Sequence, residues 1–340
     1  MFRLTKTSRI LGFLGCLGLL VSCSPRVATS FWRIGTPADS TRAGYTVIHA
    51  EGKTRHCYPI TEWTADPAVD TYHQLHHHGV AVESELMAYR IYFDKKQTID
   101  IYCKRKPQLE LATSYWYPND SLLALGYGDD ILRVSGTVGV GSVKYWNSQK
   151  MVHIEPVAER SQRIVSQSST SATIEVAVKG WEIPKSQITN YKSQIVDLAV
   201  QYTLRAGHRD MRCNVSLSEA VEGLCTGVQF IPAKSSTHRT PSDTSIIILP
   251  NGVLLASWGT DWPVNDSAKY AKETVGLAVF IPKAYAGALV HDKQNNLCLL
   301  KGTTPHFYLT CVGATKENHP VATNATEWII YLRRWAIHLR

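Results

Sequence analysis

The chain has 340 residues, of which 44% are hydrophobic, and it carries 36 Lys and Arg residues against 28 Asp and Glu residues. The apolar fraction excludes a disordered chain, and a content of 22 Gly with 15 Pro excludes a low-complexity one. This length allows one large domain or two small ones, and composition alone indicates no reaction.

The N-terminus has the pattern of an export signal. Arg3, Lys6 and Arg9 precede an apolar stretch over residues 10–21, which is shorter than the roughly 18 residues that a spanning helix needs. The stretch ends in Leu-Val-Ser-Cys23, which is similar to a bacterial lipobox, so that cleavage before Cys23 would leave its thiol to carry a lipid. An ordinary signal peptide with an incidental cysteine is the alternative interpretation.

This pattern predicts the cellular location of the mature protein. We expect a signal peptide over residues 1–22, a lipidated tether over residues 23–30 and a periplasmic protein that acyl chains on Cys23 anchor to a membrane. Removal of residues 1–22 takes away three cations and no acidic residue, which leaves 33 cations against 28 acids and a net charge of +5. That mild excess neither requires nor excludes a polyanionic partner, and no dense basic stripe indicates nucleic acid.

Six further cysteines follow Cys23, namely Cys57, Cys103, Cys213, Cys225, Cys298 and Cys311. An oxidising compartment permits up to three disulfides among them, and six cysteines allow 15 pairings. A buried reduced thiol is an equally good interpretation of each. None of the six lies in a CxxC pair, and His76 and His78 have no obvious third ligand, so we predict neither a metal nor a cofactor.

Beyond a loop-rich region that ends near residue 74, apolar and polar residues alternate with a period of two, which is typical of strands with one buried face. The alternation and several apolar runs predict strands over residues 89–93, 99–103, 173–179, 196–204, 211–217, 246–249, 253–257, 275–281, 297–300 and 307–312. A weaker strand signal lies at residues 45–49. The large apolar side chains share one face of a predicted C-terminal helix at Trp328, Tyr331, Leu332, Trp335 and Leu339.

So many strands separated by turns predict an all-β fold, a large antiparallel β-sandwich with a C-terminal helix. No linker divides the chain, so we expect a single domain over residues 31–340. The glycine-rich residues 136–141 are not followed by a helical pattern, which indicates a turn or bulge rather than a phosphate cradle.

The densest group of polar side chains lies between residues 73 and 94. On an extended chain His76 and His78 share a face, as do Glu83 and Glu85, whose spacing of about 6.6–6.8 Å is near the lower edge for paired glycosidase carboxylates. Arg90 and Tyr92 share the face opposite the apolar one and would point to water or into a groove. The alternative is a set of ordinary charges on a solvated sheet.

Two more groups combine aromatic rings with acids. Asp129 and Asp130 follow Tyr127, with Trp116 before them and Trp146 after them, and Trp258 lies close to Asp261. Such groups suit carbohydrate, because the rings stack on the apolar faces of sugars while carboxylates bind hydroxyls. Aromatic residues of the core are the alternative explanation.

The sequence from His76 to Lys104, together with Gly-Tyr-Gly-Asp-Asp at residues 126–130, resembles the bacterial family called domain of unknown function 4861. The resemblance spans roughly residues 30–340 and implies an exported protein with a β-supersandwich similar to galactose mutarotases and several polysaccharide lyases. It also implies that the protein is encoded near enzymes that process uronic-acid oligosaccharides. The resemblance does not identify a catalytic residue. Cys103 stands where we would expect a glycine of the family.

We therefore predict an exported enzyme, a lyase or hydrolase, that acts on oligosaccharides containing uronic acid. Arg90 would neutralise the sugar carboxylate, Tyr92 or His78 would move the proton, and Glu83 or Asp129 would orient the sugar. Further substrate contacts are expected from His76, Glu85, Trp116, Tyr127, Asp130, Trp146, Trp258 and Asp261.

This site requires the regions near His78, Asp129 and Trp258 to share one cleft. Two alternatives stay open from the sequence. One is a glycan-binding lipoprotein without turnover, and the other is a mutarotase-like epimerase with a His acid and a Glu base.

Overall fold

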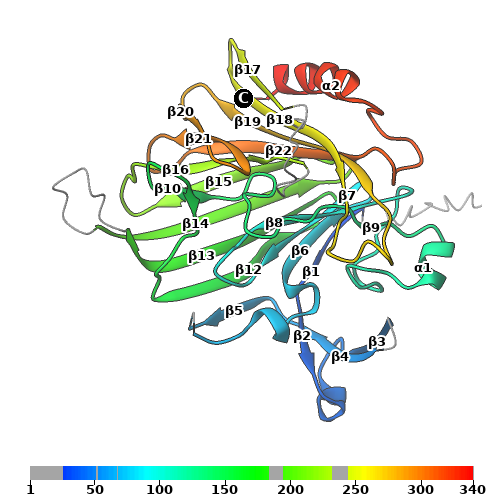
Figure 1. Ribbon diagram of the computed structural model, residues 1–340. Coiled ribbons are helices and arrows are strands. Elements are labelled where there is room, and N and C mark those ends of the chain that lie inside the picture. Colours follow the sequence, from blue (N-terminus) through cyan, green and yellow to red (C-terminus); the bar gives the residue numbers. More distant parts are fainter. Residues whose placement is uncertain (1–25, 51–52, 67, 184–193, 232–243, 340) are drawn as a thin grey trace, which may run out of the picture.

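A computed structural model describes residues 26–50, 53–66, 68–183, 194–231 and 244–339. Its largest element is a curved sheet of nine strands (Figure 1). In spatial order these are β17 (Ser245–Leu249), β18 (Gly252–Asp261), β19 (Glu273–Pro282), β22 (His306–Gly313), β15 (Met211–Leu217), β14 (Gln194–Arg205), β13 (Ser171–Ile183), β12 (Glu159–Gln167) and β5 (Glu62–Ala65).

Two smaller sheets of five strands each pack over the nine-stranded sheet. The first, which carries the polar residues, runs β1 (Val27–Ser30), β6 (Gly79–Ser84), β7 (Met87–Tyr92), β8 (Ile99–Cys103) and β9 (Asp129–Asp130). The second runs β11 (Met151–Val152), β10 (Lys144–Trp146), β16 (Leu224–Gln229), β21 (Asn295–Leu300) and β20 (Ala286–His291). The named strands pair in antiparallel fashion, which confirms the predicted all-β sandwich.

The core between these sheets follows from the period of two. In β14 the side chains of Val196, Leu198, Val200, Tyr202 and Leu204 are buried, while the residues between them are more exposed. The same alternation holds in β15. The buried faces join the inner sides of β6, β7 and β8 in one large apolar cluster, whose removal from water supplies most of the stabilisation.

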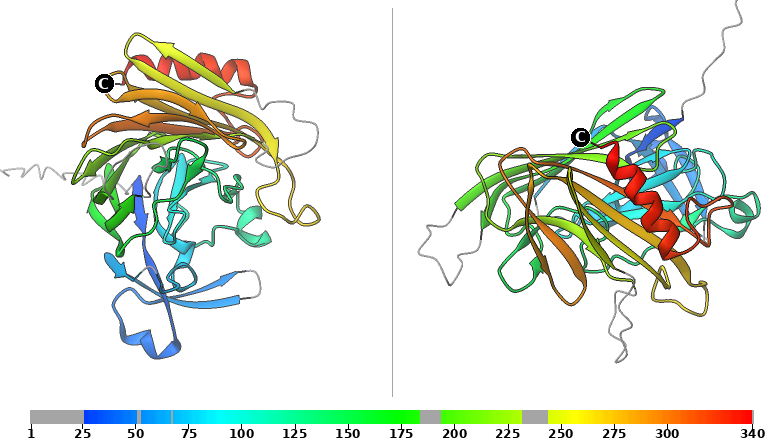
Figure 2. Two further views of the ribbon diagram at one scale, coloured as in Figure 1. Left: turned by 60° about the vertical axis from the view of Figure 1, so that its left-hand side comes forward. Right: turned by 90° about the horizontal axis from the view of Figure 1, so that it is seen from above.

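The outer face of the nine-stranded sheet is covered by helix α2 (Ala325–Ile337), which lies across β18 and β19 (Figure 2). Asn324 caps it by accepting a hydrogen bond from the Glu327 N–H at 3.0 Å. Trp328, Leu332 and Ala336 are buried against the sheet, which confirms the predicted C-terminal helix. Among the described residues, no helix is sufficiently long and apolar to cross a membrane.

A small sheet, β2 (Trp32–Gly35), β4 (Lys53–Pro59) and β3 (Thr46–Ala50), projects from the sandwich (Figure 1). Short helical turns connect the strands: η1 (Pro37–Thr41), η2 (Tyr72–Gln74), η3 (His76–His78) and α1 (Asp120–Ala124). The predicted signal peptide and Cys23 lie outside the described residues. The predicted weak strand at residues 45–49 is present as β3.

All six cysteines that follow Cys23 are buried free thiols. Burial raises the pKa of Cys57 to about 11 and that of Cys311 to about 12, so both stay protonated at neutral pH. Cys103, where a family glycine was expected, packs against Gly313 of β22 and leaves no room there for a side chain. These thiols therefore act as small apolar residues of the core.

Candidate functional site

The outer face of β7 and β8 carries a buried ion pair. Arg90 and Asp100 lie directly opposite each other on the two strands. Arg90 donates to Asp100 Oδ2 through Nε at 3.1 Å and through a terminal nitrogen at 2.8 Å, and the Tyr92 hydroxyl donates to the same oxygen at 2.7 Å. Arg90 and Asp100 are nearly inaccessible to solvent, with 2% and 1% exposure of their side chains.

Aromatic rings and a second carboxyl group complete what we call the Arg90 cluster, defined as Arg90, Tyr92, Asp100, Trp116 and Asp130. The guanidinium carbon lies 4.3 Å from the centre of the Trp116 ring, and a terminal nitrogen lies 3.5 Å from Asp130 Oδ2. This corrects one expectation, because Arg90 and Tyr92 do not point to water. The loop over residues 111–117 and the turn over residues 76–78 cover them.

The electrostatics of the cluster follow from one cation and two acids. Burial, and then the nearby Asp100, raise the pKa of Asp130 well above its usual range. Burial lowers the pKa of Arg90, but Tyr92 and Asp100 outweigh that effect, so its pKa is raised overall. Arg90 therefore stays charged and pairs with Asp100, while the raised pKa of Asp130 favours its protonated form.

The three histidines form a tight turn and not the extended segment that we predicted. His77 and His78 have left-handed backbones, with φ of 62° and 59°, so His76 and His78 do not share the face of a strand. His76 and His77 bind the backbone oxygens of Ser114 and Leu111 at 3.1 and 3.0 Å. They therefore hold the covering loop in place.

His78 is the most exposed of the three. Its ring stacks on Tyr72 with centres 4.0 Å apart, and its Nδ1 lies 2.9 Å from the Tyr72 backbone oxygen. Burial, followed by the charge of Arg90, lowers the pKa of His78 to about 3, and burial lowers that of His76 to about 4. Both rings are neutral at neutral pH, which does not favour a His acid of a mutarotase-like epimerase.

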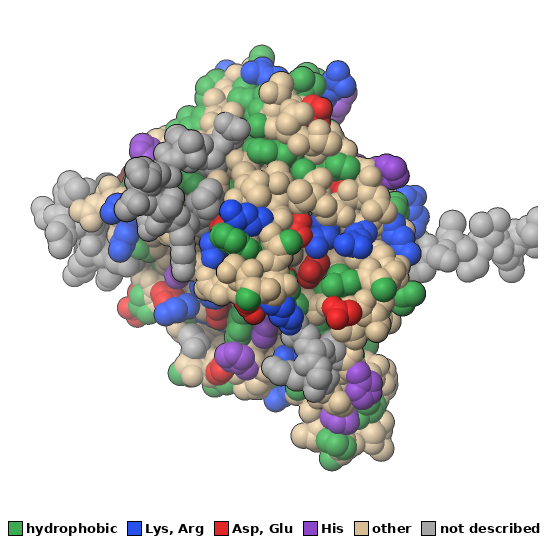
Figure 3. Space-filling model, turned by 45° about the vertical axis from the view of Figure 1, so that its right-hand side comes forward, with side chains coloured by type: hydrophobic (Ala, Val, Ile, Leu, Met, Phe, Trp, Pro, Cys, Tyr) green, Lys and Arg blue, Asp and Glu red, His purple; other side chains and the backbone are tan. Residues whose placement is uncertain are grey.

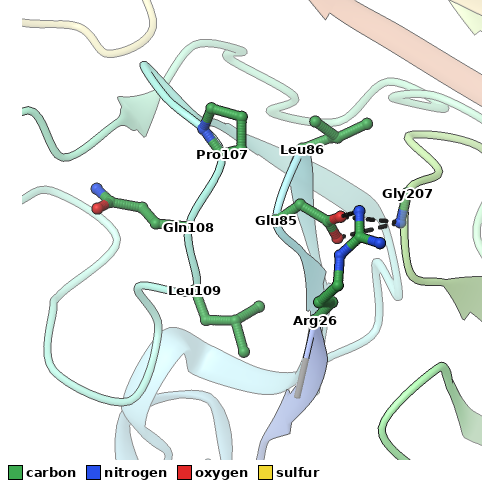
Figure 4. Close-up of a pocket in the computed structure, with 7 residues that line it drawn as sticks. All are labelled: Arg26, Glu85, Leu86, Pro107, Gln108, Leu109 and Gly207. Carbon is green, nitrogen blue, oxygen red and sulfur yellow. Dashed lines mark hydrogen bonds and ion pairs between the residues drawn. The ribbon is translucent and has the colours of Figure 1, made fainter. Parts of the chain in front are cut away.

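Glu83 and Glu85 do not form the pair of carboxylates that their spacing predicted. Glu83 is buried, pairs with Lys104, and accepts the backbone N–H groups of Glu110 and Leu111 at 2.8 and 2.9 Å. Glu85 lies beyond the end of β6 and pairs with Arg26 (Figure 4). Both carboxylates anchor loops, because each is already occupied by donors of the protein.

Asp129 lies beside an open cavity. Since side chains alternate along a strand, Asp129 points to the opposite side of β9 from Asp130. The Lys316 ammonium lies 2.8 Å from Glu273 and 3.7 Å from Asp129. These three residues with Lys269 and Tyr270 form the polar wall of a cavity of about 330 Å³, which we call the Asp129 pocket. Pro118, Asn119, Asp120, Leu123, Pro263 and Ala271 complete its lining.

The Asp129 pocket and the Arg90 cluster are neighbours. Tyr117 hydrogen-bonds Asp130 of the cluster, and its ring lies 5.8 Å from the ring of Tyr270 in the pocket wall. Burial, and then Asp130, raise the pKa of Tyr117 above its usual range, so its hydroxyl stays protonated. Tyr117 thus contacts a residue of each group.

Four predicted contacts lie apart from this pocket. Tyr127 is half-buried and bonds the Thr113 hydroxyl at 3.0 Å. Trp146 packs in the second five-stranded sheet, and Trp258 is buried under α2 against Trp328. Asp261 pairs with Arg133 at 2.6 Å. The structure therefore does not bring the regions of His78, Asp129 and Trp258 into one cleft.

Four residues of the pocket wall were not predicted from the sequence, namely Glu273, Lys269, Tyr270 and Lys316. Glu273 begins β19, and the others lie in loops that carry no motif. Only the charged and aromatic composition of residues 269–273 could have drawn attention to them. Within the described part of the chain, no group of three or more His, Cys, Asp or Glu residues is arranged to hold a metal ion.

These features define an all-β protein, an antiparallel sandwich with a polar pocket at one end of its first five-stranded sheet. The chain belongs to the family described as a domain of unknown function, DUF4861, whose family model matches residues 35–340. This confirms the resemblance seen in the motifs. A comparison with curated proteins gives no match.

Proposed function

We propose that the protein is an exported carbohydrate-active enzyme, a lyase or hydrolase, and that it acts on oligosaccharides containing uronic acid in the Asp129 pocket. The observation that carries the proposal is the composition of this pocket. Lys269 and Lys316 supply positive charge for a sugar carboxylate, and Asp129 and Glu273 can accept hydrogen bonds from hydroxyls. A cavity of about 330 Å³ is at the small end of ligand sites and suits one or two sugar units.

The same site offers a group for proton transfer. Tyr117 reaches the pocket wall through Tyr270 and is hydrogen-bonded to Asp130, whose pKa burial raises. We assign the proton-donating role to Tyr117 rather than to Tyr92, because the ring of Tyr117 contacts Tyr270 of the pocket wall, whereas Tyr92 lies in the buried Arg90 cluster. A proton donor in this position would protonate the leaving oxygen as the glycosidic bond breaks.

One observation favours a second candidate, a glycan-binding lipoprotein without turnover. Lys316 bridges Glu273 and Asp129, and the Thr315 hydroxyl donates to Glu273 at 2.6 Å. Such a closed set of contacts suits groups that hold a ligand better than groups that exchange protons with it. A binding protein would retain its oligosaccharide unchanged for partner enzymes.

A product screen separates the two candidates. The protein without its signal peptide is incubated with pectic, alginate-like and glycosaminoglycan oligosaccharides, and the mixtures are analysed by mass spectrometry. Cleavage without addition of water indicates a lyase, and products heavier by one water in total indicate a hydrolase. Activity should be lost in Tyr117→Phe and kept in Lys95→Ala, which alters an exposed lysine outside the Asp129 pocket.

Intact substrates that are nevertheless retained by the protein would make the binding protein the better account. If no substrate of the panel is either converted or bound, the proposal is wrong in both forms.

We also propose that Cys23 carries the lipid and that the protein is anchored to a membrane in the periplasm. The lipobox-like sequence Leu-Val-Ser-Cys23 supports this. Cys23→Ala should release the protein from the membrane fraction into the soluble periplasmic fraction. Equal distribution of both forms would contradict the anchor.

A further inference from the structure

Two cavities adjoin at the end of the first five-stranded sheet. One has a volume of about 430 Å³ and the other about 290 Å³, and they share Glu85, Leu86 and Pro107. We call the pair the basic groove. Figure 4 shows Pro107, Gln108 and Leu109 along one side of the first cavity, with Glu85 and Arg26 on the other. Since the two cavities share these residues, they lie next to each other.

Four turns and loops build the groove: the β6–β7 turn, residues 104–109 after β8, residues 207–209 before β15, and residues 317–319 after β22. The Asn318 N–H donates to the Arg105 backbone oxygen at 3.0 Å, which joins two of these loops. The groove is therefore part of the folded framework.

The charge of the groove is predominantly positive. Five cations and two acids line it, namely Arg26, Lys104, Arg105, Lys106 and Arg209 against Glu85 and Glu317. Three of the cations are already paired: Arg26 with Glu85, Lys104 with the buried Glu83, and Arg209 with the two oxygens of Glu317 at 2.9 and 3.1 Å. Arg105 and Lys106 therefore carry the positive charge of the groove. Arg105 and Lys106 are exposed. Figure 3, which turns the side of α1 toward the viewer, shows Lys and Arg side chains gathered on this part of the surface.

Short segments of the chain connect the basic groove with the Asp129 pocket. Lys316 lines the pocket, and the next three residues, from Glu317 to His319, line the groove. On the other side the Lys106 ammonium donates to the Leu125 backbone oxygen at 2.9 Å, just after α1, whose Asp120 and Leu123 line the pocket. The pocket and the groove thus lie on the two sides of the same short segments.

We propose that the basic groove binds the continuation of an acidic polysaccharide chain whose end occupies the Asp129 pocket. This inference rests on the proposed function and names its substrate as a polyanionic chain rather than a free disaccharide. The pocket holds one or two sugar units, and the groove offers cations for the carboxylates of the units that follow. A recessed groove suits a chain, whereas a flat lipid surface would reach basic residues that project.

The test measures affinity as a function of chain length. Oligogalacturonates from the dimer to the octamer are titrated into the full mature protein by calorimetry, at low and at high salt. Affinity should rise with length, and salt should weaken binding of the octamer more than that of the dimer. Arg105→Ala combined with Lys106→Ala should weaken the octamer by roughly tenfold and leave the dimer unchanged.

Arg205→Ala combined with Arg212→Ala is the matched control, because it also removes two exposed arginine or lysine charges but from a separate cavity near α2. If both double variants bind the octamer equally weakly, the effect is a nonspecific electrostatic attraction, and the inference about the groove is wrong. Affinity that does not depend on length would overturn it as well, while the proposed function would stand if the dimer still binds.

Two further outcomes are informative. Absence of binding at every length overturns the proposed function and the groove together. Vesicles of phosphatidylcholine with phosphatidylglycerol serve as the second probe. If the Arg105 and Lys106 variant loses vesicle binding while octamer binding is unchanged, the groove belongs to a membrane surface and the inference is wrong.

Discussion

The Arg90 cluster and the Asp129 pocket are neighbours that use similar residues in opposite ways. In the cluster, Arg90, Asp100 and Tyr92 satisfy one another and are sealed under two loops. In the pocket, the charged side chains surround a space that could receive a ligand. The comparison teaches that a group of charged and aromatic residues is a candidate for chemistry only if it lines an open cavity.

The largest effect on stability is expected at Arg90. Arg90→Ala leaves the buried Asp100 carboxylate without its cation, so we expect the free energy of unfolding to fall by about 3–5 kcal/mol. Urea denaturation measures this change. Unaltered stability together with lost activity would instead return Arg90 to the role of a carboxylate-binding residue. Arg105→Ala, an exposed arginine of the basic groove, is the control and should leave stability unchanged.

Trp258 tests the same distinction between packing and binding. Its ring is buried beneath α2 and contacts Trp328, with ring centres 6.5 Å apart. Trp258→Ala should lower the free energy of unfolding by about 3 kcal/mol through the cavity that it creates. Its affinity for oligosaccharide, measured by calorimetry under conditions where the variant is folded, should equal that of the wild type. Weaker binding by the folded variant would contradict our placement of this residue.

Much of the fold was predictable because burial imposes a period of two on the sequence. The apolar residues of β14 and β15 alternate as their strands require, and the helical face of α2 was recognised from Trp328, Leu332 and their neighbours. The prediction that Arg90 and Tyr92 share one face of their strand was also correct.

The covering loops were not predictable, because they depend on contacts between distant segments. The histidine turn gave no signal of its left-handed backbone, and His76 is tied to Ser114 far along the chain. For the same reason Glu273 and Lys316, which meet Asp129 only in the folded protein, could not be found from local patterns.

The two carboxyl groups of the Arg90 cluster are expected to contribute differently to stability. Asp100 is paired with Arg90 at 2.8 Å, whereas the raised pKa of Asp130 favours the protonated form of its carboxyl group. Asp100→Asn should therefore cost about 3 kcal/mol of stability, and Asp130→Asn, which mimics a protonated carboxyl group, less than about 1 kcal/mol. Urea denaturation of both variants at neutral pH gives the two values, and equal losses would show that both groups are ionised.

The pH dependence of Asp130 has a definite sign. Its pKa is higher in the folded than in the unfolded chain, so its contribution to stability is complete below the unfolded pKa and is lost as pH rises through the folded pKa. The stability of the wild type relative to Asp130→Asn should thus decrease with rising pH. If this relative stability instead increases with pH, the charge of Arg90 lowers the pKa of Asp130 by more than burial raises it.

An effect on binding rather than on stability is expected in the pocket, at Lys316. Its ammonium balances Glu273 and Asp129, and its side chain is only 12% exposed. Lys316→Met removes that charge while keeping most of the apolar stem, so the two acids should repel a sugar carboxylate that the wild type attracts. We expect roughly tenfold weaker binding of a uronic-acid dimer and little change for a neutral dimer. Equal losses for both sugars would mean that Lys316 shapes the pocket without recognising the carboxylate.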